Sequence, residues 1–361
     1  MASQRLSTGE TRGDAARLLL AAARERFSVA AIDLLLPTQS RLTEWQRLTA
    51  STLLAQLVRT IEDKLRATLA LSFADHDAIH AALTSAHVPI ALPLLERANV
   101  LRDGDLGNVL VRRVEEHRFY KPEAAGDLIQ ELIRDPDPAI SSEAMALLIA
   151  RSRRFDRFQE PVMGETELPA DIQHRLVWMI AASLRHYMVQ RHGLAPGRAD
   201  AAIAAAASAL IAGYDEGDSL EARCTRLVRL LDRAGRLDDA LLLRALDEGS
   251  LPVFVAAIAL RASLDHSAGW EVLSDPRGRG PALLLRAAAV ERDPAAAILL
   301  ILNAKGRLFS GSEGDAALIQ LELFDASDEA AAREILHLWQ VDPGYRAAIA
   351  RLSTRARSDG A

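Results

Sequence analysis

The chain has 361 residues, half of them hydrophobic but only 4% aromatic, so leucine, alanine, isoleucine and valine must build most of its core. Alanine and leucine are strong helix formers, whereas sheets favour β-branched and aromatic residues, so the composition predicts an all-α protein. The net charge of −6 argues against a nucleic-acid binder that relies on overall positive charge. Cys224, the one cysteine, excludes an intrachain disulfide and a cysteine-based zinc cage.

The N-terminal region begins with a polar stretch over residues 1–13, which predicts a flexible tail, and continues into a helix expected over 14–36. The apolar run at 18–23 is too short for a signal peptide. The longest uncharged run, at 201–214, is shorter than the roughly 20 apolar residues that a membrane span needs. These features predict a cytoplasmic protein without a membrane span.

A long helix is predicted over 41–71, because apolar residues recur there at steps of three or four. The apolar stripe consists of Leu54, Val58, Ile61, Leu65 and Leu69. The other face carries Arg59, Glu62, Asp63 and Arg66. Shorter helices are predicted to follow over 76–84, 89–98, 103–116, 122–134 and 138–150. Asp103 is expected to cap one of them, since its side chain can accept from free backbone N–H groups.

An Asp/Pro corner at Arg134–Pro138 separates two of these amphipathic helices. Two short helices joined in this way are typical of one unit of a stacked helical-repeat protein, which buries its apolar stripe only against neighbouring units. Segments 57–69, 88–96 and 137–148 read as degenerate copies of one half-unit at irregular spacing. We therefore predict a stacked helical array in the first half of the chain.

Residues 151–169 interrupt the helical pattern with prolines and a glycine and lack apolar periodicity, which predicts a domain boundary. The predicted N-terminal domain spans 14–155 and the predicted C-terminal, all-helical domain spans 168–353, with flexible tails at 1–13 and 354–361. Helices of the second domain are expected over 170–190, 198–212, 219–233, 237–247, 251–264, 268–273, 282–290, 294–304, 316–324, 328–340 and 343–353. The loop at 275–281 has no Walker or dinucleotide-binding pattern, so we interpret it as a connector.

Several of these segments together resemble a known family. Residues Leu57–Leu69, Val88–Leu110 and Asp127–Ala150 are similar to the N-terminal, HEAT-like part of an alphaproteobacterial domain of unknown function, and Leu241–Leu264 is similar to its C-terminal part. The resemblance implies a degenerate HEAT-like α-solenoid followed by a C-terminal helical domain. It implies no activity, and no catalytic or binding residue is carried over from it.

The best candidate for an interaction surface lies at the predicted domain boundary, where arginines alternate with phenylalanines. Its residues are Arg151, Arg153, Arg154, Phe155, Arg157 and Phe158. A basic and aromatic patch of this kind can bind an anionic partner, either nucleic acid or an acidic protein face. The alternative is structural: arginines at a helix C-terminus interact favourably with the helix dipole, and the phenylalanines pack between the two domains.

Two histidines, His76 and His80, are spaced to share one helix face, where they could hold a metal ion. The zinc-peptidase motif requires a glutamate after the first histidine, where this chain has Asp77, and no third ligand is evident. A polar helix N-terminus is the simpler interpretation. The sequence contains no Gly-x-Ser-x-Gly elbow and no cofactor motif, so it predicts no catalytic residue and no cofactor.

These observations predict a non-catalytic scaffold or regulatory adaptor that binds a protein or peptide partner along a helical surface. A nucleic-acid-binding helical-repeat protein is the first alternative, which the negative net charge disfavours. A metal-dependent enzyme that uses His76 and His80 is the second.

Overall fold

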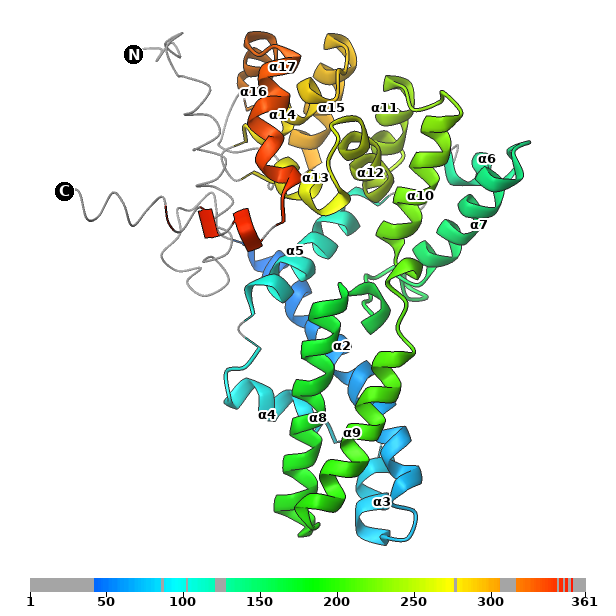
Figure 1. The fold of residues 1–361 in the computed structure, drawn as a ribbon, viewed down its shortest axis with the longest axis vertical. Coiled ribbons are helices and arrows are strands. Elements are labelled where there is room, and N and C mark those ends of the chain that lie inside the picture. Colours follow the sequence, from blue (N-terminus) through cyan, green and yellow to red (C-terminus); the bar gives the residue numbers. More distant parts are fainter. Residues whose placement is uncertain are drawn as a thin grey trace, which may run out of the picture. The chain divides into compact units, whose positions relative to one another are not determined.

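The computed structural model describes residues 42–85, 88–101, 103–120, 128–275, 278–305, 316–342, 344–346, 348–349 and 352. Within these ranges the chain folds into α-helices and short 3-10 helices, with no β-strand beyond an isolated bridge between Phe155 and Pro161 (Figure 1). The all-α prediction is therefore confirmed. The helix predicted at 14–36 and both predicted tails lie outside the described residues.

The helices form two compact units. The first unit consists of Leu42–Val114 and Leu148–Ala222, whereas the second consists, in the described part of the chain, of Glu115–Leu147 and the residues from Arg223 onward. This division differs from the predicted domains at 14–155 and 168–353, because helices within 170–212 pack against helices within 44–97. Residues 151–169, predicted to be a boundary, form an internal segment of the first unit.

The first unit is built around three helices that lie side by side, α2, α8 and α9, with α3 and α4 packed against them (Figure 1). Its complete helices are α2 (Glu44–Ser72), α3 (Asp77–Thr84), α4 (Ala91–Arg97), α8 (Ala170–His192) and α9 (Pro196–Ala212). It also holds the start of α5 (Gly104–Phe119), the end of α7 (Pro138–Ser152), η3 (Glu165–Glu167) and η4 (Glu216–Asp218).

Helix α2 follows directly from its sequence. Thr43 and Gln46 form a capping box, in which the Thr43 N–H donates to Gln46 Oε1 at 2.7 Å and the Gln46 N–H donates to Thr43 Oγ1 at 3.2 Å. The predicted apolar stripe is buried at Val58, Ile61 and Leu65 and joins side chains of α8 and α9 in one hydrophobic core. Each such side chain stabilises the unit by about 1.5–3 kcal/mol relative to an exposed one.

The charged face of α2 also reaches the interior. Glu62 accepts hydrogen bonds from the backbone N–H groups of Ile90 and Ala91, at 3.0 and 2.9 Å, where α4 begins. Arg66 pairs with Glu62 and donates to the backbone carbonyl oxygens of Ala82, Leu83, Ser85 and Val88. Both side chains are buried, and this Glu62–Arg66 clamp ties the end of α3 and the start of α4 to α2.

The second unit contains the rest of α5, most of α7 and a C-terminal series in which successive helices pack against one another. Its other elements are α6 (Leu128–Ile133), α10 (Leu220–Arg233) from Arg223 onward, α11 (Asp239–Asp247), α12 (Leu251–Arg261), α13 (His266–Leu273), α14 (Gly280–Ala287), α15 (Arg292–Lys305), α16 (Ala316–Ala326), α17 (Glu329–Leu336) and η5 (His337–Gln340). Aspartates at the N-caps of α11, α13 and α17 accept from the backbone N–H three residues later.

Arginines in this series bind the C-terminal carbonyl groups of neighbouring helices. Arg261, in the last turn of α12, donates to the carbonyl oxygens of Ala288 and Ala289 after α14, at 3.0 and 3.1 Å. Arg286, in the last turn of α14, donates to the carbonyl oxygen of Ser327 after α16 at 2.7 Å. The same contact therefore links α12 to α14 and α14 to α16, and it satisfies carbonyl groups that a helix end leaves free.

Replacing Ala289 by glycine is expected to raise the free energy of unfolding by up to about 1 kcal/mol. Ala289 has a φ of 52°, a left-handed conformation that costs an L-residue energy, and it is exposed, so little packing is lost with its methyl group. Urea unfolding of the full chain measures the change. Ala182→Gly, at an exposed site in the middle of α8, is the control and should instead cost about 1 kcal/mol. Destabilisation by both changes would contradict the prediction.

The connector predicted at 275–281 joins α13 to α14, and its first residue, Asp275, bonds to the start of α14. Asp275 Oδ2 accepts from the N–H groups of Arg279 and Gly280 at 2.9 and 3.2 Å. A Cβ atom on Gly280 would lie only 1.7 Å from the carbonyl oxygen of Val272, so the close approach of these two helices requires glycine. The N–H groups of Arg279 and Gly280 are thus satisfied by Asp275 at the start of α14.

The described residues include no single helix that is both long and apolar enough to cross a membrane. Helices α12 and α13 satisfy this length and composition criterion only as a pair, and they bend by 102° at their junction. Most residues of α12 are buried within the second unit, which accounts for their apolar character.

Candidate functional site

Residues 153–162, which follow α7, form a closed loop that we call the tip loop. Its two sides are joined by backbone hydrogen bonds from the Val162 N–H to the Arg154 carbonyl and from the Asp156 N–H to the Glu160 carbonyl, each at 3.0 Å. Asp156 Oδ1 also accepts from the N–H groups of Phe158 and Glu160 at 2.7 and 2.9 Å. The turn is therefore organised by its own backbone and one carboxylate.

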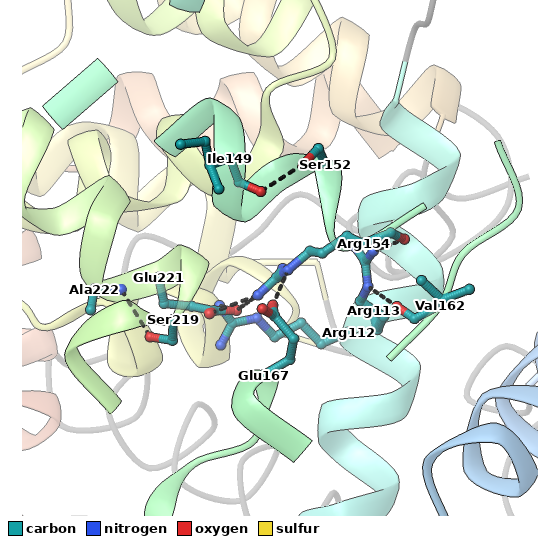
Figure 2. A network of polar contacts seen from close by, with 10 residues as sticks. All are labelled: Arg112, Arg113, Ile149, Ser152, Arg154, Val162, Glu167, Ser219, Glu221 and Ala222. Carbon is teal, nitrogen blue, oxygen red and sulfur yellow. Dashed lines mark hydrogen bonds and ion pairs between the residues drawn. The ribbon is translucent and has the colours of Figure 1, made fainter. Parts of the chain in front are cut away.

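The base of the tip loop is held by a buried network of charged side chains (Figure 2). The Arg154 guanidinium, which is 2% exposed, binds Glu167 through Nε and both carboxylate oxygens of Glu221 through Nη2, the latter at 2.8 Å. Arg112 binds the same Glu221 carboxylate at 3.1 Å. Arg113 donates to the carbonyl oxygen of Arg154 and lies over the ring of Phe155. Four side chains from three separate segments thus hold one loop.

Local structure places each member of this network. Arg112 and Arg113 are consecutive residues on α5, and Glu167 ends η3. Glu221 lies in the first turn of α10, where Ser219 Oγ accepts from the Ala222 N–H at 3.2 Å. Arg154 and Glu167 are the most deeply buried pair, and removing either would leave its partner desolvated, which is strongly destabilising.

Tyr214 lies close to the same carboxylates. Its hydroxyl donates to the carbonyl oxygen of Leu168, just after η3. Burial, together with the negative charges of Glu216, Glu221 and Glu167, raises the pKa of the Tyr214 phenol well above its ordinary value. The phenol therefore keeps its proton, and this hydrogen bond, throughout the physiological pH range.

The structure separates the six residues that the sequence grouped as one surface. Arg154 is buried in the network and Phe155 lies half-buried beneath Arg113, so these two side chains hold the loop and are not free to meet a partner. Arg151 is half-buried at the end of α7. Arg153 and the Arg157–Phe158 pair face outward.

The exposed part of the tip loop is an arginine stacked on an aromatic ring. The Arg157 guanidinium lies 4.6 Å from the centre of the Phe158 ring, and Phe158 is 68% exposed. Neighbouring Gln159 adopts a left-handed conformation with a φ of 64°, which turns the chain back at this point. An aromatic ring and a guanidinium on a pre-organised loop are groups that dominate many protein interfaces.

The predicted histidine pair is arranged differently from a pair within one helix. His76 is the N-cap residue of α3, with a non-helical φ of −126°, and His80 is exposed one turn later. Over the described ranges, no three histidine, cysteine, aspartate or glutamate side chains gather closely enough to hold a metal ion.

Comparison with known proteins identifies a family model that matches the chain. The family model described as "Uncharacterised protein conserved in bacteria (DUF2336)" matches residues 124–337. This range includes Asp127–Ala150 and Leu241–Leu264, two of the segments on which the resemblance to a family of unknown function rested, and it includes the whole tip loop. No curated protein and no solved structure matches the chain.

Proposed function

The chain belongs to this family of uncharacterised bacterial proteins, DUF2336, and we propose that it is a non-catalytic adaptor that binds a protein partner through its tip loop. The observation that carries the proposal is the exposed Arg157–Phe158 stack on a loop fixed by a buried ion network. A large exposed aromatic side chain costs solubility, and a buried network costs desolvation. Both features are accounted for if the loop must present these side chains in one geometry.

Repeated contacts within the second unit support the proposed helical array. The aspartate N-caps of α11, α13 and α17 and the arginine contacts from α12 to α14 and from α14 to α16 repeat along the second unit. Repeated contacts of this kind are what a degenerate HEAT-like array requires, since each helix pair is held by its neighbours. We propose that the second unit is such an array; the tip loop itself belongs to the first unit.

Affinity capture tests the proposed binding site. Tagged full-length protein, and a variant carrying Arg153→Ala, Arg157→Ala and Phe158→Ala, are used to capture partners from a lysate of the source bacterium, with quantification by mass spectrometry. A partner bound by the wild type is expected to fall at least about tenfold in the variant, which corresponds to about 1.4 kcal/mol. Arg154 is left unchanged, because its loss would disturb the loop itself.

The matched control carries Arg59→Ala and Leu71→Ala, an exposed arginine and a leucine that is 83% exposed, both on α2. This control removes the same kinds of surface group from another place on the first unit. Capture that is equal for the wild type and both variants would refute the tip loop as the binding site.

Nucleic-acid binding by the same arginines is the second candidate function. It predicts that nucleic acid co-elutes with the wild type, is lost in the tip-loop variant and dissociates steeply as salt is raised. Release of the partner by nuclease treatment would favour this candidate over the adaptor.

A further inference from the structure

Most arginines that the structure describes in the first unit are already paired with carboxylates. Those within ion-pair distance of an aspartate or glutamate are Arg47, Arg59, Arg66, Arg112, Arg154, Arg175, Arg185 and Arg198. Arg153 and Arg157, like Arg97 and Arg191 on helices of the same unit, pair with no carboxylate among the described residues. The tip loop therefore leaves two guanidinium groups open in a chain whose net charge is negative.

Asp156, the carboxylate next to Arg157 on the loop, does not pair with that arginine. Its Oδ1 atom is bound to the N–H groups of Phe158 and Glu160 inside the turn. The same bonds fix the backbone on both sides of Phe158, and so fix the position from which its side chain projects. Little conformational entropy remains to be lost when a ligand binds.

Stacking on Phe158 leaves a defined part of Arg157 available. A guanidinium that stacks on an aromatic ring can still donate from the N–H groups on its edge, which form a fork. The group that matches this fork is a carboxylate, bound by two parallel hydrogen bonds. Phe158, 68% exposed, adds an apolar surface directly beside it.

We infer that the tip loop binds a linear segment of its partner in which an aspartate or glutamate stands close to an apolar residue. The carboxylate would be held by the edge of Arg157, and the apolar side chain would lie against Phe158. This inference rests on the proposed function and specifies the chemistry of the partner.

A nucleic acid fits the loop less well. Affinity for nucleic acid depends on neutralising several phosphates along a strand. Here the two open arginines lie beside the exposed Glu160 in a chain with a net charge of −6, so the surrounding field opposes a polyanion. One carboxylate in an otherwise apolar or neutral segment meets far less of this opposition, because it carries a single charge.

Selection from a library of random displayed peptides tests the inference. Peptides are selected on the wild-type protein after depletion on a variant carrying Arg157→Gln and Phe158→Ala. The recovered peptides are expected to be enriched in aspartate or glutamate next to apolar residues. One recovered peptide is then synthesised, along with a version in which Asn and Gln replace Asp and Glu, and binding is measured by fluorescence anisotropy.

The amide version is expected to bind at least about tenfold more weakly to the wild type, and Arg157→Gln should lose the same factor toward the acidic peptide. Arg157→Lys should recover only part of the affinity, because an ammonium group cannot form the fork. Arg191→Gln, at an exposed arginine near the end of α8, is the matched control and should bind as the wild type does.

Two results would overturn the inference. Loop-dependent peptides without acidic enrichment would remove the carboxylate from the proposal while leaving the tip loop as a protein-binding site. Recovery of no loop-dependent peptide, or loop-dependent binding of a mixed-sequence single-stranded oligonucleotide in its place, would remove the linear acidic segment altogether. The capture experiment decides the proposed function separately, because it measures native partners of any shape.

Discussion

Replacing Arg66 by alanine is expected to lower the free energy of unfolding by about 3–5 kcal/mol, since it removes one partner of a buried ion pair. The Glu62 carboxylate, at 3% side-chain exposure, would lose its guanidinium partner, and several carbonyl groups around the end of α3 would lose their donor. The change is measured by urea unfolding of the full chain, followed by circular dichroism. Glu62→Ala should cost a similar amount, because it leaves the Arg66 guanidinium buried without its carboxylate.

The same helix supplies a matched control. Arg59 and Asp63 are also four residues apart on α2, but their side chains are 71% and 59% exposed and 3.8 Å apart. Arg59→Ala is therefore expected to change stability by less than about 1 kcal/mol. The two ion pairs therefore have the same sequence spacing but differ in burial. Losses of similar size for Arg59→Ala and Arg66→Ala would show that the Glu62–Arg66 clamp contributes no more than a surface ion pair.

Local features of the fold could be predicted from the sequence. The helices predicted at 41–71 and 170–190 agree with α2 and α8 to within a turn, because apolar periodicity and end signals are local. Asp103 was predicted as a cap, and its Oδ1 atom accepts from the N–H groups of Asp105 and Leu106. Features set by neighbouring residues could therefore be predicted.

Features that depend on contacts between distant residues could not be predicted from the sequence. Glu62 and Arg66 share a helix face with Arg59 and Asp63, and nothing in their spacing distinguishes a buried pair from an exposed one. Only the tertiary packing identifies the segments that bury them, which are the end of α3 and the start of α4. The two-unit division has the same origin, since it depends on α8 and α9 packing against α2.

The candidate site was predicted in part for the same reason. The alternation of arginine and phenylalanine at 151–158 drew attention to the right segment. It could not show that Arg154 points inward, because the residues that receive it, Glu167 and Glu221, lie 13 and 67 positions later. Two carboxylates at unremarkable positions thus decide which of the arginines remain outside.

Replacing Arg154 by alanine is expected to lower the free energy of unfolding by about 3–5 kcal/mol and to abolish partner capture, although every exposed residue of the tip loop is retained. Glu167, at 3% side-chain exposure, would lose its guanidinium partner, and the base of the loop would lose its anchor. Hydrogen exchange should become faster at Asp156, Glu160 and Val162, whose N–H groups close the loop. Unfolding in urea, exchange and capture measure the three effects.

Two neighbouring substitutions separate holding the loop from contacting the partner. Arg153→Ala removes an exposed guanidinium and should weaken capture while leaving stability and exchange unchanged. Ser152→Ala, at an exposed serine whose hydroxyl donates only to the Ile149 carbonyl at 2.7 Å, should leave all three nearly unchanged. If Arg154→Ala loosens the loop but captures its partner as well as the wild type, recognition does not depend on a fixed loop geometry. Loss of capture in that variant, beside retained capture in Ser152→Ala, would mean that the buried network sustains binding by holding Arg157 and Phe158 in place.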